Sequence, residues 1–455
     1  MNWTGKNILV VGMARSGVAA ARLLTALGAQ VTINDSKPAS ELGEALEPLA
    51  GISVRRALGC PAEQVARDAE MIVLSPGVPM SLPFVAEARS RGIPVWAELE
   101  VGYRETACPI AAITGTNGKS TTTVLLGEIL RDAGYSTYVD GNIGRPITED
   151  AASTTPEDRM VLEVSSYQLE GIDKFRPAVS AILNLTEDHL ARHKTMEGYL
   201  DVKARIFMNQ RGEDVCVLNA DDPRVYGLWE RVPCRRWAFS RRRVVEDGAC
   251  LQEGRLVLMR EGKAQDLLAA EELGIPGAHN LENALAAAAM AMAMGVAAAD
   301  IARTLRRFRG IEHRIETVAT VRGVTFINDS KATNVDSALV ALRTMKAPTV
   351  LIAGGSYKVT DYAPLVKALD GVVTDLVLTG DTAQEIADTC DRLGFTAYHR
   401  AETFEEAVCM AYALAPQGGN VLLSPACASF DHFNDFEHRG RVFKEIVARL
   451  QREAQ

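Results

Sequence analysis

The sequence lacks several features that would place it in a specialised class of protein. Its eight cysteines form no C-x-x-C pair and are widely scattered, which argues against both a zinc ribbon and a disulfide framework. We therefore expect reduced, mostly buried thiols. Positive charge is also scarce, because 49 Lys and Arg face 58 Asp and Glu. The net charge of −9 excludes a surface built to neutralise a nucleic-acid backbone, so we expect no nucleic-acid partner and only local anion sites.

The chain also has no long, strongly hydrophobic run. The longest apolar stretch, residues 284–299, is rich in Ala and Met and contains Gly295. It falls short of the about 20 strongly apolar residues that a membrane span needs, so we predict a buried helix instead. The N-terminus has neither the basic nor the long apolar segment of a signal peptide. We expect a cytoplasmic protein without a membrane span, and a monomer.

Short Val, Ile and Leu runs alternate with helical patterns over most of the 455 residues. This alternation predicts an α/β protein with mainly parallel sheets covered by helices on both faces. The length predicts two to four domains, and we divide the chain into blocks 1–98, 99–309 and 310–455. The first block opens with a predicted strand at 8–11 and a helix to about residue 27. Many runs end in Gly, Asp, Ser or Pro, where ligands of open α/β sheets bind.

The strongest local signal is Ile113-Thr114-Gly115-Thr116-Asn117-Gly118-Lys119-Ser120-Thr121, which follows a predicted strand and opens a predicted helix. Backbone N–H groups there can cradle phosphates, Lys119 can neutralise their oxygens, and the Ser120 hydroxyl can bind Mg²⁺. The spacing departs from G-x-x-x-x-G-K-[ST], since Ile113 stands where the first glycine belongs. The alternative is a glycine-rich turn that binds nothing. The strand, the Lys-Ser pair and the helix together favour a nucleotide site.

Further candidate metal ligands follow neighbouring strands. Glu163 ends the apolar run MVLEV, as expected of a metal-binding acid beside a phosphate loop, although it could be an exposed strand-end carboxylate. His189 follows the next strand and could supply a second ligand. His189 and His193 have the i,i+4 spacing of helical zinc ligands, but the glutamate of H-E-x-x-H is missing, so zinc is the weaker hypothesis. Composition alone makes Lys203 a solvated helix lysine.

The first block contains a second glycine-rich turn, Gly12-Met13-Ala14-Arg15-Ser16-Gly17, and Asp35-Ser36-Lys37 follows the next predicted strand. The turn lacks the middle glycine of G-x-G-x-x-G, so a dinucleotide pyrophosphate approaches the backbone less easily. A UDP site is more plausible. Arg15 and Lys37 supply local positive charge, although Arg15 alone could be a solvated residue at a helix start.

At this point the motifs resemble a known family, the ATP-dependent Mur ligases, whose shortened phosphate loop reads G-T/S-N-G-K-S/T-T. The resemblance covers essentially the whole chain, and its most specific parts point to the members that add D-glutamate. It implies a Rossmann-like N-terminal domain, a P-loop ATPase-like central domain and a Rossmann-like C-terminal domain. The motifs that carry it are DGNIG (140–144), LEVSSYQL (162–169), NLTEDH (184–189), NDSKATN (328–334), LSPACAS (423–429) and FEHRG (436–440).

The resemblance implies an enzyme of peptidoglycan precursor synthesis. ATP would phosphorylate the carboxylate of UDP-N-acetylmuramoyl-L-alanine, and the amine of D-glutamate would attack the acyl phosphate to give an amide, ADP and phosphate. Two Mg²⁺ ions are implied, one at Ser120 and Glu163 and the second at His189. Lys203 aligns with a lysine that the family carbamylates, which replaces the solvated-lysine interpretation. CO₂ would convert this cation into an anion that can bind Mg²⁺.

The resemblance also assigns residues to each substrate. Those implied for ATP are Gly115, Thr116, Asn117, Gly118, Lys119, Ser120, Thr121, Asn280, Arg314, Asp329 and Lys331. Those implied for the UDP-linked substrate are Arg15, Ser16, Asp35, Ser36, Lys37, Ser75, Gly77 and Asn142. Those implied for D-glutamate are Thr333, Lys358, Ser429 and Phe436. Lys119, Glu163, His189 and Lys203 would be catalytic. The sequence departs from the family at Tyr357, where Asp or Gly is common.

Three alternatives stay open at this stage. A sister ligase for another amino acid, or a folylpolyglutamate synthase, would share mainly the phosphate loop and lack the NDSKATN and SPACAS runs. A nicotinamide dehydrogenase would be built on the first block, but the missing G-x-G-x-x-G and the second nucleotide loop count against it. A non-catalytic nucleotide-binding interaction protein would not need the full set of Lys119, Ser120, Glu163, His189 and Lys203.

Overall fold

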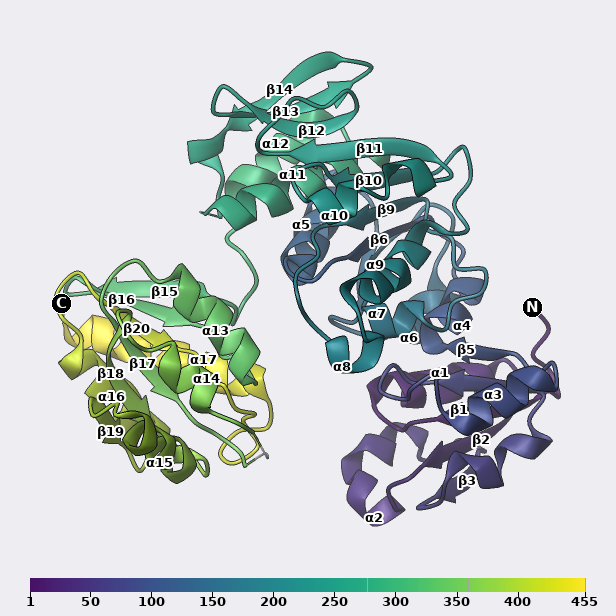
Figure 1. Ribbon diagram of the computed structural model, residues 1–455, viewed down its shortest axis with the longest axis horizontal. Helices are drawn as coiled ribbons and strands as arrows, with labels where there is room; N and C mark the ends of the chain where they lie inside the picture. The colour runs from purple at the N-terminus through teal and green to yellow at the C-terminus, as the bar shows by residue number, and fades with distance from the viewer. Residues whose placement is uncertain (276, 358–359, 455) are drawn as a thin grey trace. The chain divides into compact units, whose positions relative to one another are not determined.

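The computed structural model describes residues 1–275, 277–357 and 360–454 (Figure 1). It contains three sheets and falls into two compact units, Met1–Phe308 and Arg309–Gln455. The first unit holds two sheets and the second unit holds one. Strands pair mainly in parallel in all three sheets, which confirms the predicted α/β class.

The first sheet is wholly parallel, in the order β3-β2-β1-β4-β5. Alternate residues of its first strand bury opposite faces: Ile8 and Val10 pack in one cluster, Leu9 and Val11 in another. The strands are β1 (Asn7–Val11), β2 (Gln30–Asp35), β3 (Arg55–Leu58), β4 (Met71–Leu74) and β5 (Val95–Ala97). The helices are α1 (Arg15–Ala26), α2 (Ala39–Leu42), α3 (Pro83–Ser90) and α4 (Glu98–Glu105). The predicted first strand and the helix that follows it are confirmed.

The second sheet has the order β14-β13-β12-β11-β10-β9-β6-β8-β7. It is parallel from β7 to β12, and β12, β13 and β14 extend it in antiparallel pairs. The strands are β6 (Ile110–Thr114), β7 (Thr137–Gly141), β8 (Arg159–Glu163), β9 (Val179–Ile182), β10 (Val215–Asn219), β11 (Arg235–Ser240), β12 (Gly248–Gln252), β13 (Arg255–Arg260) and β14 (Lys263–Ala269).

Helices cover both faces of this second sheet (Figure 1). Ala111 and Ile113 of β6 pack toward α5 and α11, whereas Ile110 and Ala112 pack in the cluster that includes α9. Strands buried on both faces are apolar throughout, which explains the continuous runs in the sequence. The helices are α5 (Lys119–Asp132), α6 (Ile147–Asp150), α7 (Ser166–Leu169), α8 (Leu190–His193), α9 (Met196–Ala204), α10 (Pro223–Tyr226), α11 (Ala278–Ala293) and α12 (Ala298–Arg307).

The Ala- and Met-rich stretch forms a buried helix, as predicted, but this helix does not extend over the whole stretch to residue 299. Helix α11 ends at Ala293, and the chain turns at Gly295, whose φ of +86° suits glycine. Helix α12 begins only at Ala298. Within the described part of the chain, no helix is both long and apolar enough to cross a membrane.

The sheet of the second unit has the order β15-β16-β20-β17-β18-β19 and is parallel except for the edge strand β15. Two clusters on its opposite faces form the core. The strands are β15 (Glu316–Val321), β16 (Val324–Asn328), β17 (Thr349–Ala353), β18 (Val373–Leu378), β19 (Tyr398–Arg400) and β20 (Asn420–Leu423). The helices are α13 (Val335–Thr344), α14 (Ala363–Lys367), α15 (Ala383–Leu393), α16 (Phe404–Leu414) and α17 (Phe436–Glu453).

All eight cysteines lie among the described residues, and each is a free thiol. Six are buried, at 108, 216, 234, 250, 390 and 427, and the other two are partly exposed. The prediction of reduced, mostly buried thiols is therefore confirmed.

Candidate functional site

The phosphate-loop motif connects β6 to α5, the position expected from the sequence. Asn184, just after β9, clamps the loop from the side. Its Oδ1 accepts the Asn117 N–H at 2.8 Å, its Nδ2 donates to the Asn117 carbonyl at 3.0 Å, and its own carbonyl accepts the Thr116 N–H at 3.1 Å. Lys119 opens α5 and donates from Nζ to the Thr116 carbonyl at 2.9 Å. The loop is thus held in shape by protein contacts alone, with a helix N-terminus behind it.

Gly118 has φ +82°, in the left-handed region, and sits against α11. A Cβ at this position would lie 2.2 Å from Oδ1 of Asn283. The close approach places the first turn of α11 beside the loop, and with it Asn280, whose Oδ1 accepts from Asn283 Nδ2 at 3.4 Å. Asn280, which the family resemblance assigns to ATP, therefore lies close to the phosphate loop although about 160 residues separate the two in the chain.

Glu163 ends β8 at the same edge of the sheet and is 3% exposed. Its Oε1 accepts from Asn142 Nδ2 at 2.7 Å, while its buried Oε2 has no hydrogen-bond partner. A buried carboxylate oxygen without a donor is costly unless a cation or water satisfies it. Ser120, in the first turn of α5, is also buried. Carboxylate and hydroxyl oxygens are the ligands that Mg²⁺ prefers, so these residues fit a magnesium site.

Lys203 lies on α9 and is 1% exposed, so the solvated-lysine interpretation from composition is wrong. Its Nζ donates to the Gly115 carbonyl at 2.8 Å and lies 4.5 Å from the centroid of the Tyr199 ring. Burial, and then the neighbouring charge of Lys119, hold the pKa of Lys203 well below its usual value. The side chain thus points under the phosphate loop as an amine that is easily deprotonated.

The two histidines of the next loop face different partners. His189, with φ +54°, accepts or donates at Nδ1 to the Tyr167 hydroxyl at 3.0 Å, and its Nε2 is 3.3 Å from Asp188 Oδ2. His193 is buried, with Nε2 2.9 Å from Ser166 Oγ. Among the described residues, no group of three or more His, Cys, Asp and Glu is placed to hold a metal, so the zinc hypothesis gains no support.

The UDP-substrate residues of the first block converge on the turn after β1. Ser75 donates from Oγ to the Gly12 carbonyl at 2.7 Å. Asp35, the last residue of β2, accepts the Met13 N–H at Oδ2 and the Lys37 N–H at Oδ1, at 2.8 and 2.9 Å. Arg15 opens α1 and donates to the Gly144 carbonyl at 2.9 Å, which brings it to the DGNIG segment that contains Asn142. Ser16 follows Arg15 in the first turn of α1, and Ser36 and Gly77 lie in the loops after β2 and β4.

In the second unit, two residues assigned to ATP, Asp329 and Lys331, follow β16, and the third, Arg314, precedes β15. Asp329 is buried and accepts from Ser424 Oγ at 2.7 Å and from the Ile315 N–H at 3.2 Å. Burial raises the pKa of Asp329 to about 7, although these two hydrogen bonds and the charge of Arg314 act in the opposite direction. Nζ of Lys331 lies 5.8 Å from the centroid of the Phe436 ring. Arg314, Asp329, Lys331 and Phe436 are thus brought to one edge of the sheet.

Of the residues assigned to D-glutamate, Ser429 lies in the loop after β20, Phe436 opens α17 just beyond it, and Thr333 lies between β16 and α13. Ser429 is buried, and the preceding Ala428 accepts the Ser356 N–H at 3.0 Å. Thr333 is half-buried, and its N–H donates to the Lys331 carbonyl at 2.9 Å. Tyr357, the departure from the family pattern, is 68% exposed. Lys358 lies outside the described residues.

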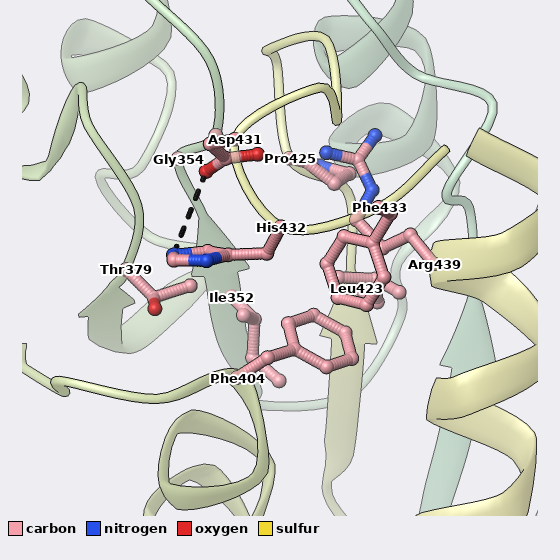
Figure 2. Close-up of a pocket in the computed structure, with 11 residues that line it drawn as sticks. Ile352, Gly354, Thr379, Phe404, Leu423, Pro425, Asp431, His432, Phe433 and Arg439 are labelled. Atoms are coloured by element: carbon pink, nitrogen blue, oxygen red, sulfur yellow. Dashed lines mark ion pairs between the residues drawn. The ribbon is translucent and has the colours of Figure 1, made fainter. Parts of the chain in front are cut away.

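Sequence reasoning gave no role to Arg439, which holds this region together and lines the pocket in Figure 2. The buried guanidinium donates from Nε to Ser330 Oγ at 3.0 Å and from Nη2 to the carbonyls of Ser330 and Cys427 at 2.9 and 3.1 Å. Burial lowers the pKa of Arg439 to about 10, and nearby Asp431 partly opposes this. The only signal for it was its place in the FEHRG motif.

Models of three protein domains match consecutive parts of this chain. The Mur ligase MurD-like N-terminal domain matches residues 6–97, the Mur ligase middle domain residues 113–291, and the Mur ligase glutamate ligase domain residues 313–427. This chain belongs to the Mur ligase family.

Full-length relatives narrow the family further. A protein of Caldanaerobacter subterraneus is 46% identical over 98% of this chain and 99% of its own length, and one of Alkaliphilus oremlandii is 44% identical over 99% and 100%. Both are named UDP-N-acetylmuramoylalanine--D-glutamate ligase. The resemblance inferred from the motifs is confirmed for the D-glutamate-adding branch.

Solved structures agree with this Mur ligase in fold. MurC of Thermotoga maritima, a UDP-N-acetylmuramate-alanine ligase, has a TM-score of 0.58 at 21% identity and covers 98% of this chain and 99% of its own. A MurF of Acinetobacter baumannii has a TM-score of 0.56 at 18% identity over 94% of this chain and 86% of its own.

Proposed function

We propose that this Mur ligase joins D-glutamate to UDP-N-acetylmuramoyl-L-alanine and converts ATP to ADP and phosphate in the process. The observation that carries the proposal is the full-length identity of 42–46% to relatives named for this reaction. The clamped phosphate loop with Lys119, and Glu163 and Lys203 beside it, supports the same chemistry. Domains 1–98, 99–309 and 310–455 would bind the UDP-linked substrate, ATP and D-glutamate, in a cytoplasmic monomer.

The central site must first reduce the repulsion between ATP and a substrate carboxylate. Lys119 and the N–H groups of the loop and of the first turn of α5 would bind the phosphate oxygens. Mg²⁺ would be held by Ser120 and Glu163, and a second ion by His189; when bound, it neutralises charge on the phosphates. Asn142, whose side chain donates a hydrogen bond to Glu163, would orient the carboxylate of the UDP-linked substrate toward ATP.

Lys203 would act as a carbamate. Its buried environment favours the neutral amine, whose nitrogen lone pair can attack the carbon of CO₂. The new N–C bond forms as one C–O π pair moves to oxygen, and the nitrogen releases one proton to solvent. The product is an anion with two oxygens, in place of a buried neutral amine close to Lys119. Such an anion would add metal-binding oxygens to those of Glu163.

The second unit would supply the amino-acid site and further ATP contacts. Arg314, Asp329 and Lys331 lie at one edge of its sheet and would contact ATP, as the resemblance implies. Thr333, Ser429 and Phe436, together with Lys358, would bind the two carboxylates of D-glutamate, and Arg439 joins the segments that carry Ser429 and Phe436 to Ser330.

The test is phosphate release by the purified chain with ATP, Mg²⁺ and UDP-N-acetylmuramoyl-L-alanine, with D-glutamate, L-glutamate, L-lysine or diaminopimelate in separate reactions. We expect release only with D-glutamate. Release with another amino acid would keep the ligase but reject the assigned substrate, and no release in any reaction would refute the proposal. Lys119→Ala should abolish turnover, whereas Lys263→Ala, an exposed lysine on β14, should not change it.

A further inference from the structure

His193 has a buried side chain and has no role in the proposed reaction. Its side chain is 2% exposed, its Nε2 lies 2.9 Å from Ser166 Oγ, and its Nδ1 lies 3.6 Å from Glu170 Oε1. Both ring nitrogens therefore have protein partners. These contacts hold the imidazole ring of His193 in one orientation. The side chain of His189, four residues earlier, is 44% exposed and is less confined.

The imidazole ring of His193 packs against Tyr199. The two rings are stacked, with centroids 5.0 Å apart and an angle of 18° between their planes. Tyr199 is 1% exposed, and burial, the larger effect, raises the pKa of its hydroxyl group, although the side chain of Thr116, in the phosphate loop, is close enough to that hydroxyl to lower the pKa. The tyrosine ring therefore lies next to the loop at its hydroxyl and is covered on one face by His193.

Lys203 lies against the same tyrosine, with Nζ 4.5 Å from the ring centroid. Tyr199 and Lys203 are separated by four residues on α9, so their side chains project from one face of the helix. Ser166, the partner of His193, opens α7 three residues after Glu163. The His193–Tyr199 pair thus connects the phosphate loop, the segment after the metal-binding carboxylate and the lysine.

We infer that His193 is a positioning residue that, by stacking on Tyr199, holds the Lys203 amine where it reacts with CO₂ and where the resulting carbamate lies beside Glu163. The inference rests on the proposed function, because it assumes that Lys203 is carbamylated. A long lysine side chain has several rotamers, and a rigid aromatic wall limits them. Without that wall, fewer molecules hold the amine under the loop and the carbamate loses its fixed place.

Three variants separate the contacts of His193. His193→Phe keeps a ring that can stack on Tyr199 but loses the hydrogen bond to Ser166 and the nitrogen near Glu170. His193→Gln keeps a donor for Ser166 but loses the ring, and His193→Ala loses both. Leu200→Ala is the matched control, since Leu200 is a partly buried residue of α9 beside a surface pocket that contains neither Tyr199 nor Lys203.

The readout is the ¹³C NMR carbamate signal of the full chain in ¹³C-bicarbonate, without ATP or metal, with Lys203→Ala as the blank. We expect His193→Phe to keep more than half of the wild-type signal, and His193→Gln and His193→Ala to fall at least threefold. Turnover of the last two should fall in proportion and recover as bicarbonate is raised, with the KM for ATP unchanged.

Several outcomes would overturn the inference. A wild-type signal in His193→Gln, or an equal loss in His193→Phe, would remove the stacking role. An equal loss in Leu200→Ala would assign the effect to a general loosening of α9. A wild-type chain that ligates D-glutamate without any carbamate signal would reject carbamylation and this inference together, while the proposed ligase reaction would stand.

Discussion

Glu98, the first residue of α4, offers a test of the electrostatics away from the candidate site. The side chain is completely buried, and burial raises the pKa of Glu98 to about 7 from an ordinary value of 4.5. Its Oε1 accepts the N–H and hydroxyl of Thr148 at 3.0 and 2.7 Å, but its buried Oε2 has no partner. The folded protein therefore binds a proton at Glu98 more tightly than the unfolded chain does.

The sign of the pH dependence follows from this difference. Below pH 4.5 the Glu98 carboxyl is protonated in both the folded and the unfolded state, so its ionisation does not affect the free energy of unfolding. Between pH 4.5 and about 7 the unfolded chain releases the proton and the folded chain does not, so the free energy of unfolding decreases as pH rises. A rise from 4.5 to about 7, at about 1.4 kcal/mol for each tenfold change in proton affinity, amounts to about 3 kcal/mol. The loss is complete above pH 7.

Glu98→Gln should remove this dependence, because the amide keeps the oxygen that Thr148 contacts and does not ionise. Urea unfolding followed by tryptophan fluorescence measures the right part of the chain, since all four tryptophans lie in the unit Met1–Phe308. The difference in unfolding free energy between variant and wild type should shift by about 3 kcal/mol toward the variant between pH 4.5 and 8. Parallel curves over this range would refute the reasoning.

Three further outcomes are expected. Gly118→Ala should lower the unfolding free energy of the first unit by about 1 to 3 kcal/mol and slow turnover severely, because the new Cβ would collide with Asn283 and the backbone φ is positive. Urea unfolding and phosphate release measure the two effects. Wild-type values in both assays would contradict the prediction. Glu163→Gln should raise the Mg²⁺ concentration for half-maximal activity at least tenfold, and an unchanged Mg²⁺ titration would remove Glu163 from the metal site. Arg439→Ala should destabilise the second unit by about 2 to 4 kcal/mol in calorimetry, since buried carbonyls such as that of Cys427 lose their donor; a change below about 1 kcal/mol would show that they find other partners.

Local patterns predicted the sheets well, because strands buried on both faces produce continuous apolar runs, and polar residues follow at the end of each strand. The end of α11 was missed, since valine and alanine continue the apolar run past the turn and only Gly295 marks it. The same limit affected Lys203. A lysine in a helix carries no local sign of burial, and only the packing of α9 under the phosphate loop reveals it.

Residues that act through others were harder to find from sequence than residues that would touch a substrate. Asn184 and Arg439 lie inside recognised motifs, but their roles depend on which backbone groups the fold brings within reach. His193 was noticed only for its spacing from His189, and the structure places it on Ser166 and Tyr199 instead. The role of Lys358 stays a prediction from the family resemblance.

The buried guanidinium of Arg439 has a consequence for protein engineering. It joins Ser330, in the segment after β16, to Cys427, in the segment after β20, although nearly a hundred residues separate them in the chain. An exchange of amino-acid specificity between relatives that replaced only residues 427–435 would leave these donors facing carbonyls of a different shape. The smallest unit for such a graft is therefore both segments together with the arginine that connects them.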